Sequence, residues 1–357
     1  MAKVIVVGAG PVGLSAALWL KKNQNDVSII DKKPAITELT KAIAVNSRTL
    51  ELFESIDLAE NMIAHGHKIH RMCFRYGDRQ KFSIDFSELN HRYNFILAIP
   101  QATTESLLIE ALASYDLKVS WNQKLIECKQ QANSVKVLLQ QADLYHTKYY
   151  DYCLGADGAH STIRKDQGFE FQGKMYPDEW SLVDLMMDWP YSENEANIWF
   201  FNSGIVLFVM PLGQQQFRMV ANTNNALEYL PTYIQINKIS WQSNFKVECR
   251  QTKSFQSGWV FLAGDSAHVH SPAGGRGMNL GIEDAYQFAN HLAQDELAIY
   301  NTNRYRKAKR VLTDTDLMFR IAKLKNPFLR YMRNHVLFNL MTQRIITQKM
   351  LCRMAGL

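Results

Sequence analysis

The chain of 357 residues is too long for one small domain and suits two interleaved ones, and its 47% hydrophobic and 21% charged residues are typical of a globular protein with a sizeable core. Its five scattered cysteines, odd in number and without a C-x-x-C pair, argue against a disulfide framework or a zinc site and favour a reducing compartment. The formal net charge of +6 is unevenly placed, because residues 302–357 hold 13 Lys or Arg against 2 Asp or Glu while the rest holds 27 against 32.

The first thirty-one residues contain the motif around which the chain is organised. A short apolar run, Lys3–Val7, is followed at once by the glycine turn Gly8–Gly13, with the sequence G-A-G-P-V-G. A helical pattern then extends from Leu14 to Lys22, and a second apolar run, Val27–Ile30, ends on an acid, Asp31. The order strand, glycine turn, helix, strand and acid predicts a site for an adenine dinucleotide.

Each part of this motif has a physical role in gripping such a ligand. Gly8 permits the tight turn, Gly10 lets the backbone approach a pyrophosphate, and Gly13 lets the helix and the strand pack closely. The helix N-terminus, with its positive dipole end, faces the phosphates, and Asp31 accepts hydrogen bonds from the ribose hydroxyls. Taken alone, the motif leaves NAD, NADP and FAD open.

The apolar N-terminus is not expected to be a signal peptide, because the glycine turn interrupts it and it lacks a basic leader and a small-residue cleavage site. No run approaches the roughly 18 uninterrupted apolar residues of a membrane span. We therefore expect a cytoplasmic protein, and we expect no metal site.

Several further elements are predicted between residues 47 and 152. Ser47 is the expected cap of a helix, and residues 69–86 alternate about Gly77-Asp78 as a β-hairpin does. The other expected elements are a helix over Thr104–Ala113, a strand that begins at Val119–Trp121, and a three-stranded meander over 124–130, 134–140 and 145–152.

Two more glycine-containing turns follow apolar runs. The first is Gly155-Ala156-Asp157-Gly158, with Ser161 and Arg164 after it, and the second is Gly264-Asp265-Ser266-Ala267-His268 after the strand 258–263. The loop 271–279 then places glycines before a helix, where backbone N–H groups can meet an anion or a polar ring edge. Between these turns, residues 180–249 are mostly strand-like and aromatic, which suits one wall of an apolar pocket.

Together, the three turns resemble those of the single-component FAD-dependent monooxygenases of the p-hydroxybenzoate hydroxylase type. The resemblance covers Met1 to about His291. It implies an α/β fold of mixed α+β character, with a Rossmann-like FAD-binding domain interleaved with an antiparallel-sheet substrate domain and followed by a C-terminal helical segment. The expected ranges are 1–70, 98–176 and 255–300 for the FAD-binding domain, 71–97 and 177–254 for the substrate domain, and 301–357 for the helical segment.

The resemblance also implies roles for individual residues. Asp157 serves the approach of both FAD and NAD(P)H, and Asp265 contacts the ribityl chain. Gln101 touches the flavin side, while His268 supports the cofactor loop rather than acting as a catalytic base. Lys41 stands where the family usually has an arginine, Pro272 matches a loop proline near the substrate, and residues 277–279 line the flavin ring. The complete expected cofactor-binding set is Gly8, Gly10, Pro11, Val12, Gly13, Asp31, Lys32, Lys41, Gln101, Asp157, Gly264, Asp265, Pro272, Gly275, Gly277, Met278 and Asn279; no catalytic residue is assigned.

The activity that the resemblance implies is hydroxylation by a flavoprotein oxidoreductase. NADPH or NADH acts as a transient reductant, and a flavin C4a-hydroperoxide hands one oxygen atom of O2 to an aromatic or lipophilic substrate. The chain shows no second glycine fingerprint of the kind found in glutathione-reductase-like enzymes, and no W-x-W-x-I-P stretch of the halogenases. Two alternatives stay open: an FAD-dependent reductase of prenyl or other unsaturated chains, and a non-catalytic flavoprotein.

The basic C-terminal segment has two interpretations. We expect amphipathic helices that pack on the mildly acidic body with their cations in water. The alternative is peripheral contact with an anionic membrane, which fits a lipophilic substrate. Nucleic-acid binding is not expected, because no recognition motif accompanies the charge. The sequence does not predict an oligomeric state.

Overall fold

The first sheet of the protein carries the glycine turns at one edge. A computed structural model describes residues 1–37, 42–77, 79–270, 275–324 and 326–357. Its five-stranded sheet has the order β17 (Gln256–Ser257), β18 (Val260–Leu262), β11 (Tyr152–Gly155), β1 (Lys3–Val7) and β2 (Asp26–Ile30). Strand β1 pairs in parallel with both β2 and β11, and β11 pairs in parallel with β18. The carboxyl ends of these four strands, which precede the turns and Asp31, therefore meet at the same edge.

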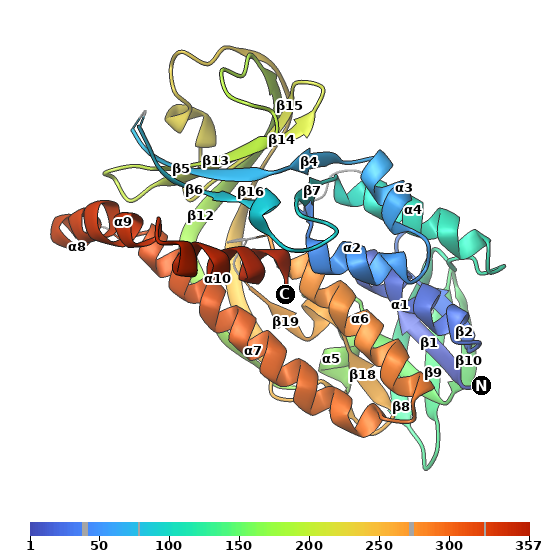
Figure 1. The fold of residues 1–357 in the computed structure, drawn as a ribbon. Helices are drawn as coiled ribbons and strands as arrows, with labels where there is room; N and C mark the ends of the chain where they lie inside the picture. Colours follow the sequence, from blue (N-terminus) through green and yellow to red (C-terminus); the bar gives the residue numbers. More distant parts are fainter. Residues whose placement is uncertain (38–41, 78, 271–274, 325) are drawn as a thin grey trace.

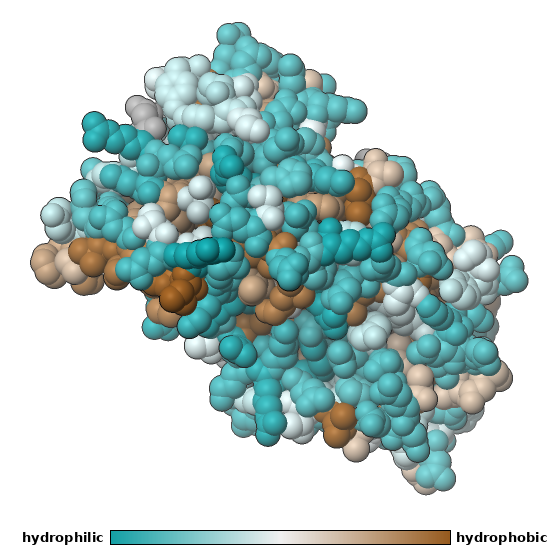
Figure 2. All heavy atoms as spheres, viewed as in Figure 1, coloured by the Kyte–Doolittle hydropathy of each residue, from teal (hydrophilic) through white to brown (hydrophobic). Residues whose placement is uncertain are grey.

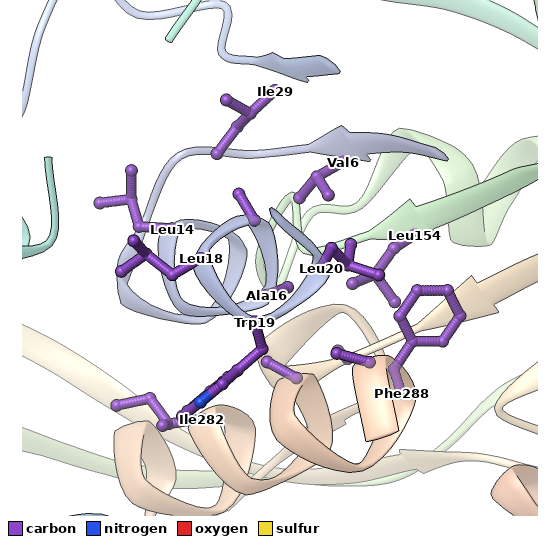
Figure 3. Packing of buried hydrophobic residues seen from close by; sticks show 14 of the residues in the cluster. Val6, Leu14, Ala16, Leu18, Trp19, Leu20, Ile29, Leu154, Ile282 and Phe288 are labelled. Carbon is purple, nitrogen blue, oxygen red and sulfur yellow. The ribbon is translucent and has the colours of Figure 1, made fainter. Parts of the chain in front are cut away.

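Helix α1 (Pro11–Lys22) lies between this sheet and α6 (Gly277–Ala293) (Figure 1, Figure 3). Its side chains are apolar on nearly all sides, so that Leu14 and Leu18 are fully buried and Trp19 packs beside Ile282 of α6. A helix that is apolar all round is stable only when covered on both sides, which explains this central position. Helix α4 (Gln101–Ala113) also packs against α1.

A three-stranded antiparallel sheet of β8 (Gln123–Gln130), β9 (Val135–Gln141) and β10 (Leu144–Tyr150) shares this core, and α5 (Thr162–Asp166) contacts β8. This is the predicted meander. A small sheet has the strand order β3 (Ala44–Val45), β7 (Ile96–Ala98) and β4 (His67–Ile69). Along the chain, helices α2 (Ser47–Glu54) and α3 (Ala59–Ala64) connect β3 to β4.

The largest sheet lies above these layers in Figure 1 and has eight strands, most of them antiparallel. Their order is β19 (His268–Val269), β16 (Ile236–Thr252), β12 (Phe171–Met187), β15 (Gln216–Ala221), β14 (Val206–Gly213), β13 (Glu195–Phe200), β5 (Arg71–Tyr76) and β6 (Arg79–Asp85). Strands β5 and β6 form the predicted hairpin, whose residue 78 lies outside the described residues. Short 3-10 helices cover Phe86–Glu88 (η1), Ala226–Tyr229 (η2) and Gly264–Ser266 (η3).

The C-terminal segment is helical, as expected, and packs on the body. It comprises α7 (Leu297–Ala322), α8 (Pro327–Tyr331), the π-helix η4 (Met332–Leu337), α9 (Phe338–Leu340) and α10 (Arg344–Ala355). Helix α7 contacts α6 and β16, while α9 and α10 contact β6. Within the described ranges, no helix is both long and apolar enough to cross a membrane.

The predicted fold class is confirmed, with two local corrections. Ser47 is not the helix cap; Asn46 is, because its side chain accepts a hydrogen bond from the Thr49 N–H at 3.0 Å. Val119–Trp121 does not begin a strand, since only one bridge joins Ser120 to Ile30. The division of the chain into domain ranges stays a prediction.

Candidate cofactor site

The first turn has the geometry that its glycines predict. Gly8 has a φ of +107°, and a Cβ there would lie 2.3 Å from the Ala156 carbonyl oxygen. A Cβ on Gly13 would lie 1.8 Å from the Gly8 carbonyl oxygen, so this position cannot hold a larger residue without displacing the helix. A Cβ on Gly10, in contrast, would have no heavy atom of the described residues within 4 Å. Packing within the protein therefore explains two of the glycines, and the third leaves room beside the backbone.

The N-terminus of α1 faces the same region. No side chain within the described ranges caps it, and Pro11 occupies the first turn, where its missing N–H costs no helical hydrogen bond. Val12 packs against the third turn, because its Cγ2 lies 2.8 Å from a Cβ built on Gly264 and 2.6 Å from one built on Gly281. The first and third turns are thus in direct contact.

Asp31 organises the end of β2. Its carboxylate accepts hydrogen bonds from the backbone N–H of Ala9 at 2.7 Å and of Lys33 at 2.9 Å. The side chain is half-buried beside the first turn, whereas Lys32 is exposed. Asp31 therefore holds the first turn in place, and its contact with a ribose stays a prediction.

Gln101 stands at the start of α4, where its Nε2 donates to Glu105 Oε1 at 2.8 Å and its backbone N–H donates to the Ala42 carbonyl at 3.2 Å. Glu105 is a buried residue that the sequence did not single out. Burial raises the pKa of its carboxyl, and the charge of Asp31 adds to this, while the Gln101 amide and Lys33 oppose it. The spacing of four residues along a helix was the signal that could have linked Glu105 to Gln101.

The second turn contains Asp157, whose Oδ2 accepts from the Thr162 N–H at 2.6 Å in the first turn of α5, beside the N-cap Ser161. Its Oδ1 is buried and has no hydrogen-bond partner among the residues that the structure describes. Burial raises the pKa of this carboxyl, although hydrogen bonds from Ser161 and from the α5 N–H groups oppose the shift. Arg164 of the same motif donates to the Ser266 carbonyl at 2.9 Å, which joins the second turn to the third.

The third turn begins at Gly264, with a φ of +64°, and exposes the side chain of Asp265. His268 is fully buried and does not face this opening. Its Nε2 lies 2.6 Å from Asp284 Oδ2, and Asp284 Oδ1 accepts from Arg304 Nε at 2.6 Å. Burial works against the charge of Asp284, but Arg304, His268 and the Gly264 N–H together hold its carboxyl pKa below the usual value. This geometry supports a structural role for His268.

The loop before α6 meets the segment before α2. Asn279 Nδ2 donates to the carbonyls of Ala44 and Gly275, each at 2.9 Å, and its Oδ1 accepts from the Asn46 N–H at 2.9 Å. Gly277 begins α6, and Met278 packs against the main core. Asn279 thus ties together two backbone segments that border the site. Lys41 and Pro272 lie outside the described residues.

These observations bring the three turns to one edge of one sheet, and the comparison with known proteins agrees with that arrangement. Residues 1–297 match the family described as "FAD binding domain". The chain belongs to this family of FAD-binding proteins. It is 29% identical over 350 residues to a 6-methylpretetramide 4-monooxygenase of Streptomyces rimosus, which covers 91% of this chain and 63% of the relative. It is also 30% identical over 351 residues to a pentachlorophenol 4-monooxygenase of Sphingobium chlorophenolicum, which covers 90% of this chain and 65% of the relative.

The fold has close counterparts among solved structures. A p-nitrophenol 4-monooxygenase from Pseudomonas putida DLL-E4 superposes with a TM-score of 0.88 at 21% identity, over 99% of this chain and 97% of that one. At this identity the likeness shows the fold alone. The resemblance to the p-hydroxybenzoate hydroxylase type is confirmed, and the chain spans a little under two thirds of the length of the two curated relatives above.

The residues present fit FAD. Gly10 leaves open space beside an uncapped helix N-terminus, which suits a pyrophosphate. Asp157 Oδ1, which has no hydrogen-bond partner among the described residues, and the exposed Asp265 are carboxylates of the kind that can accept hydrogen bonds from hydroxyl groups. Among the described residues, no group of His, Cys, Asp or Glu side chains is arranged to hold a metal ion. The individual contacts of the predicted residues with FAD stay predictions.

Proposed function

We propose that the chain is an FAD-dependent, NAD(P)H-consuming monooxygenase that inserts one oxygen atom of O2 into an aromatic or lipophilic substrate. When bound, FAD supplies the oxygen chemistry, through the C4a-hydroperoxide that the family resemblance implies. The balanced reaction converts NAD(P)H, a proton, O2 and the substrate into NAD(P)⁺, water and the hydroxylated product.

The observation that carries this proposal is the convergence of the three turns. Gly8 contacts Ala156 of the second turn, Val12 contacts Gly264 of the third, and Arg164 binds the Ser266 carbonyl. The three turns therefore lie together at one edge of the five-stranded sheet, which supports an FAD site there. Two relatives that match 91% and 90% of this chain are named 6-methylpretetramide 4-monooxygenase and pentachlorophenol 4-monooxygenase, which supports the same reaction class here.

The chain's own contribution is to bind, orient and exclude water. The apolar cluster between the large sheet and the C-terminal helices includes Ile43, Met210 and Phe200, each less than a tenth exposed, and its edge reaches Ala44 beside the cofactor residues. Such a wall shields reactive oxygen species from water, so that oxygen goes to the substrate rather than to hydrogen peroxide.

The test uses the purified protein reconstituted with FAD. Oxidation of NADPH or NADH is measured with O2 uptake and peroxide release, with and without a panel of phenols. The proposal expects substrate-stimulated oxidation with an oxygenated product. Anaerobic reduction of a substrate double bond would support the reductase alternative, and flavin binding without turnover would support the non-catalytic one. NADPH and NADH are compared directly, because neither is favoured by the residues.

We also propose that the C-terminal segment meets an anionic membrane. Residues 317–357 contain eight Lys or Arg and no Asp or Glu: Arg320, Lys323, Lys325, Arg330, Arg333, Arg344, Lys349 and Arg353. Large apolar side chains stand among them, with Phe328 68% and Ile345 73% exposed, and Figure 2 shows an apolar area at the end of the molecule formed by α8 and α9. Apolar side chains with surrounding cations are typical of interfacial helices.

Co-sedimentation with vesicles tests this contact. Binding is expected to vesicles rich in phosphatidylserine and to weaken with added salt and with Phe328→Glu and Ile345→Glu together. The control is Leu144→Glu, which changes an equally exposed apolar residue on β10. Equal binding to neutral vesicles, or no loss in the double variant, would contradict the proposal.

A cytoplasmic location also stays our proposal, since all five cysteines are free thiols.

A further inference from the structure

The C-terminal segment holds positive charge that no carboxylate of its own balances, since residues 317–357 contain no Asp or Glu. Two of its arginines, Arg330 in α8 and Arg333 in the π-helix η4, are three positions apart along the chain. Residues at this spacing lie on the same side of a helix, which brings the two guanidinium groups near each other. A π-helix is a rare element that occurs frequently at functional sites.

Arg333 is 2% exposed, and its hydrogen bonds use only part of its guanidinium group. Its Nη1 donates to the Ala322 carbonyl at 2.6 Å, at the end of α7, and its Nε donates to Asn334 Oδ1 at 2.9 Å. The first contact caps α7, because the C-terminal carbonyls of a helix attract a cation. Nη2 is buried and has no hydrogen-bond partner among the residues that the structure describes. Helix capping therefore explains Nη1 and leaves the donors of Nη2 unused.

The surroundings of Arg333 are aromatic rather than acidic. Its guanidinium carbon lies 4.8 Å from the centre of the Phe200 ring and 5.9 Å from the centre of the Phe338 ring. Burial, together with the charge of Arg330, lowers the pKa of Arg333 to about 10, while Tyr76 opposes the shift. No carboxylate of the described ranges contributes to that pKa. Because a buried cation without a counter-charge is costly, this position favours the binding of an anion.

Arg330 extends the unbalanced charge toward the surface. The residue is half-buried, and its Nε is buried without a hydrogen-bond partner in the described part of the chain. Around it, the helices expose large apolar side chains, which Figure 2 shows as the apolar area at this end of the molecule. These side chains are Phe328, Leu329, Tyr331, Met332, Val336 and Leu340. Two guanidinium groups with unused donors therefore stand within an exposed apolar surface.

We propose that Arg330 and Arg333 form a binding site for the phosphate group of a phosphomonoester lipid, whose acyl chains lie on the exposed apolar side chains of α8, η4 and α9. The inference rests on the membrane contact proposed above and names the headgroup that this contact selects. A phosphomonoester carries a charge of about −1.5 to −2 at pH 7, and its oxygens accept strong hydrogen bonds from arginine. Binding requires the side chains that cover Nη2 of Arg333 to move, which a surface of flexible exposed residues such as Met332 allows.

The first test uses soluble lipids, so that it does not depend on a membrane. The FAD-loaded protein is titrated in a calorimeter with dihexanoyl phosphatidic acid, dihexanoyl phosphatidylcholine and hexanoate, each below its micelle concentration. The native protein is expected to bind phosphatidic acid at least about tenfold more tightly than the other two ligands. The reason is that the net-neutral phosphatidylcholine and the singly charged hexanoate do not balance two arginines.

Arg330→Met is the sharpest variant, because the Arg330 Nε has no partner in the described structure whose loss could unfold the segment. It should weaken the binding of phosphatidic acid about tenfold, and its stability in urea should be unchanged or higher, since it removes the repulsion of Arg333. Arg333→Met should weaken binding as well, but it also removes the cap of α7. The matched control is Arg344→Met, which makes the same change at an exposed arginine of α10 and should leave the affinity unchanged.

The second test compares vesicles of equal surface charge that contain either phosphatidic acid or phosphatidylserine. More native protein should sediment with phosphatidic acid, and Arg330→Met should remove this preference. Equal or tighter binding of hexanoate, or equal losses in Arg330→Met and Arg344→Met, would overturn the inference.

The two tests separate this site from the membrane contact on which it rests. Binding of soluble phosphatidic acid through Arg330, without sedimentation on any vesicle, would refute the membrane contact alone. Sedimentation with phosphatidylserine vesicles, without any preference for phosphatidic acid in either test, would refute the phosphate site alone.

Discussion

The glycines of the first turn give a sharp prediction, because two of them are required for different reasons. Gly13→Ala would place a Cβ 1.8 Å from the Gly8 carbonyl oxygen, whereas ordinary contacts begin at 3.4 Å. Helix α1 would have to move away from the turn, and the helix lies in the middle of the main core. Gly10→Ala meets no atom of the described part of the chain within 4 Å, and the Gly10 φ of −79° and ψ of −177° are open to alanine.

The expected magnitudes follow from these distances. Overpacking of this kind costs typically about 1–3 kcal/mol, and the backbone clash at Gly13 places it at or above about 3 kcal/mol. Alanine at Gly10 should keep the stability of the FAD-free protein or raise it by up to about 1 kcal/mol, since it restricts the unfolded chain. It should weaken FAD binding at least about tenfold, because its Cβ occupies the side on which the pyrophosphate approaches.

Urea unfolding with and without FAD separates the two effects. At a free FAD concentration about 100-fold above the dissociation constant, the native protein gains about 2.7 kcal/mol, and a tenfold loss of affinity in Gly10→Ala lowers that gain by about 1.3 kcal/mol. Gly13→Ala should be unstable even without FAD. A Gly10→Ala protein that binds FAD as tightly as the native one would refute the proposed approach of the cofactor to this backbone.

Three further predictions concern buried groups. Burial raises the pKa of Asp157 above its usual 3.8, so the folded state binds the proton more tightly than the unfolded state does. The free energy of unfolding therefore falls as pH rises from the unfolded-state pKa through the folded-state pKa. Relative to the native protein, Asp157→Asn should gain stability in urea unfolding between about pH 4 and about pH 7. Arg304→Met leaves the buried charge of Asp284 without the guanidinium that binds it, and should lower the free energy of unfolding by about 3–5 kcal/mol. Adding Asp284→Asn should recover part of that loss in urea unfolding, and no recovery would argue against a charge effect. Burial, reinforced by Glu195, raises the pKa of the Cys73 thiol to about 12. Iodoacetamide at about pH 8 should therefore modify the half-buried Cys352 and leave Cys73 intact, as measured by mass spectrometry. Early labelling of Cys73 would contradict its burial.

The cofactor site was accessible to sequence reasoning because each of its parts is local. The Gly8 turn needs a positive φ and a close approach that only glycine supplies, and it lies between two short apolar strands whose period is plain. The helix after it, and Asp31 at the end of the next strand, follow within one βαβ unit. Sequence alone left the dinucleotide open, and the later turns at Asp157 and Gly264 pointed to FAD through their resemblance to a known family.

The residues that the sequence missed depend on partners far along the chain. Ser47 was predicted to be the cap because it precedes an apolar pattern, but Asn46 is the cap. The backbone N–H of Asn46 also donates to the Oδ1 of Asn279, which lies 233 residues further along the chain. Local propensity cannot decide between two neighbouring cap residues when a distant side chain fixes the backbone of one of them. The expected strand at Val119–Trp121 fails for a comparable reason. Its residues favour a strand locally, but among the described residues only Ser120 forms a bridge, to Ile30 of β2.

The large sheet shows the same limit more strongly, in the ion pair of Arg218 Nη2 with Asp184 Oδ2 at 2.6 Å. Asp184 and Arg218 meet only because β12 pairs with β15, and each is one polar residue in an alternating strand, where a solvent-facing position is the ordinary expectation. On β16 the register shifts opposite Asp184, so that Trp241 pairs with Asp184 but Ile239, two residues earlier, pairs with Leu185. Alternation counted through such a bulge assigns residues on its two sides to the wrong faces. The Arg218–Asp184 pair therefore acquires its position from the pairing of β12 with β15, and the facing of the β16 residues depends on the bulge, neither of which the order of residues alone reveals.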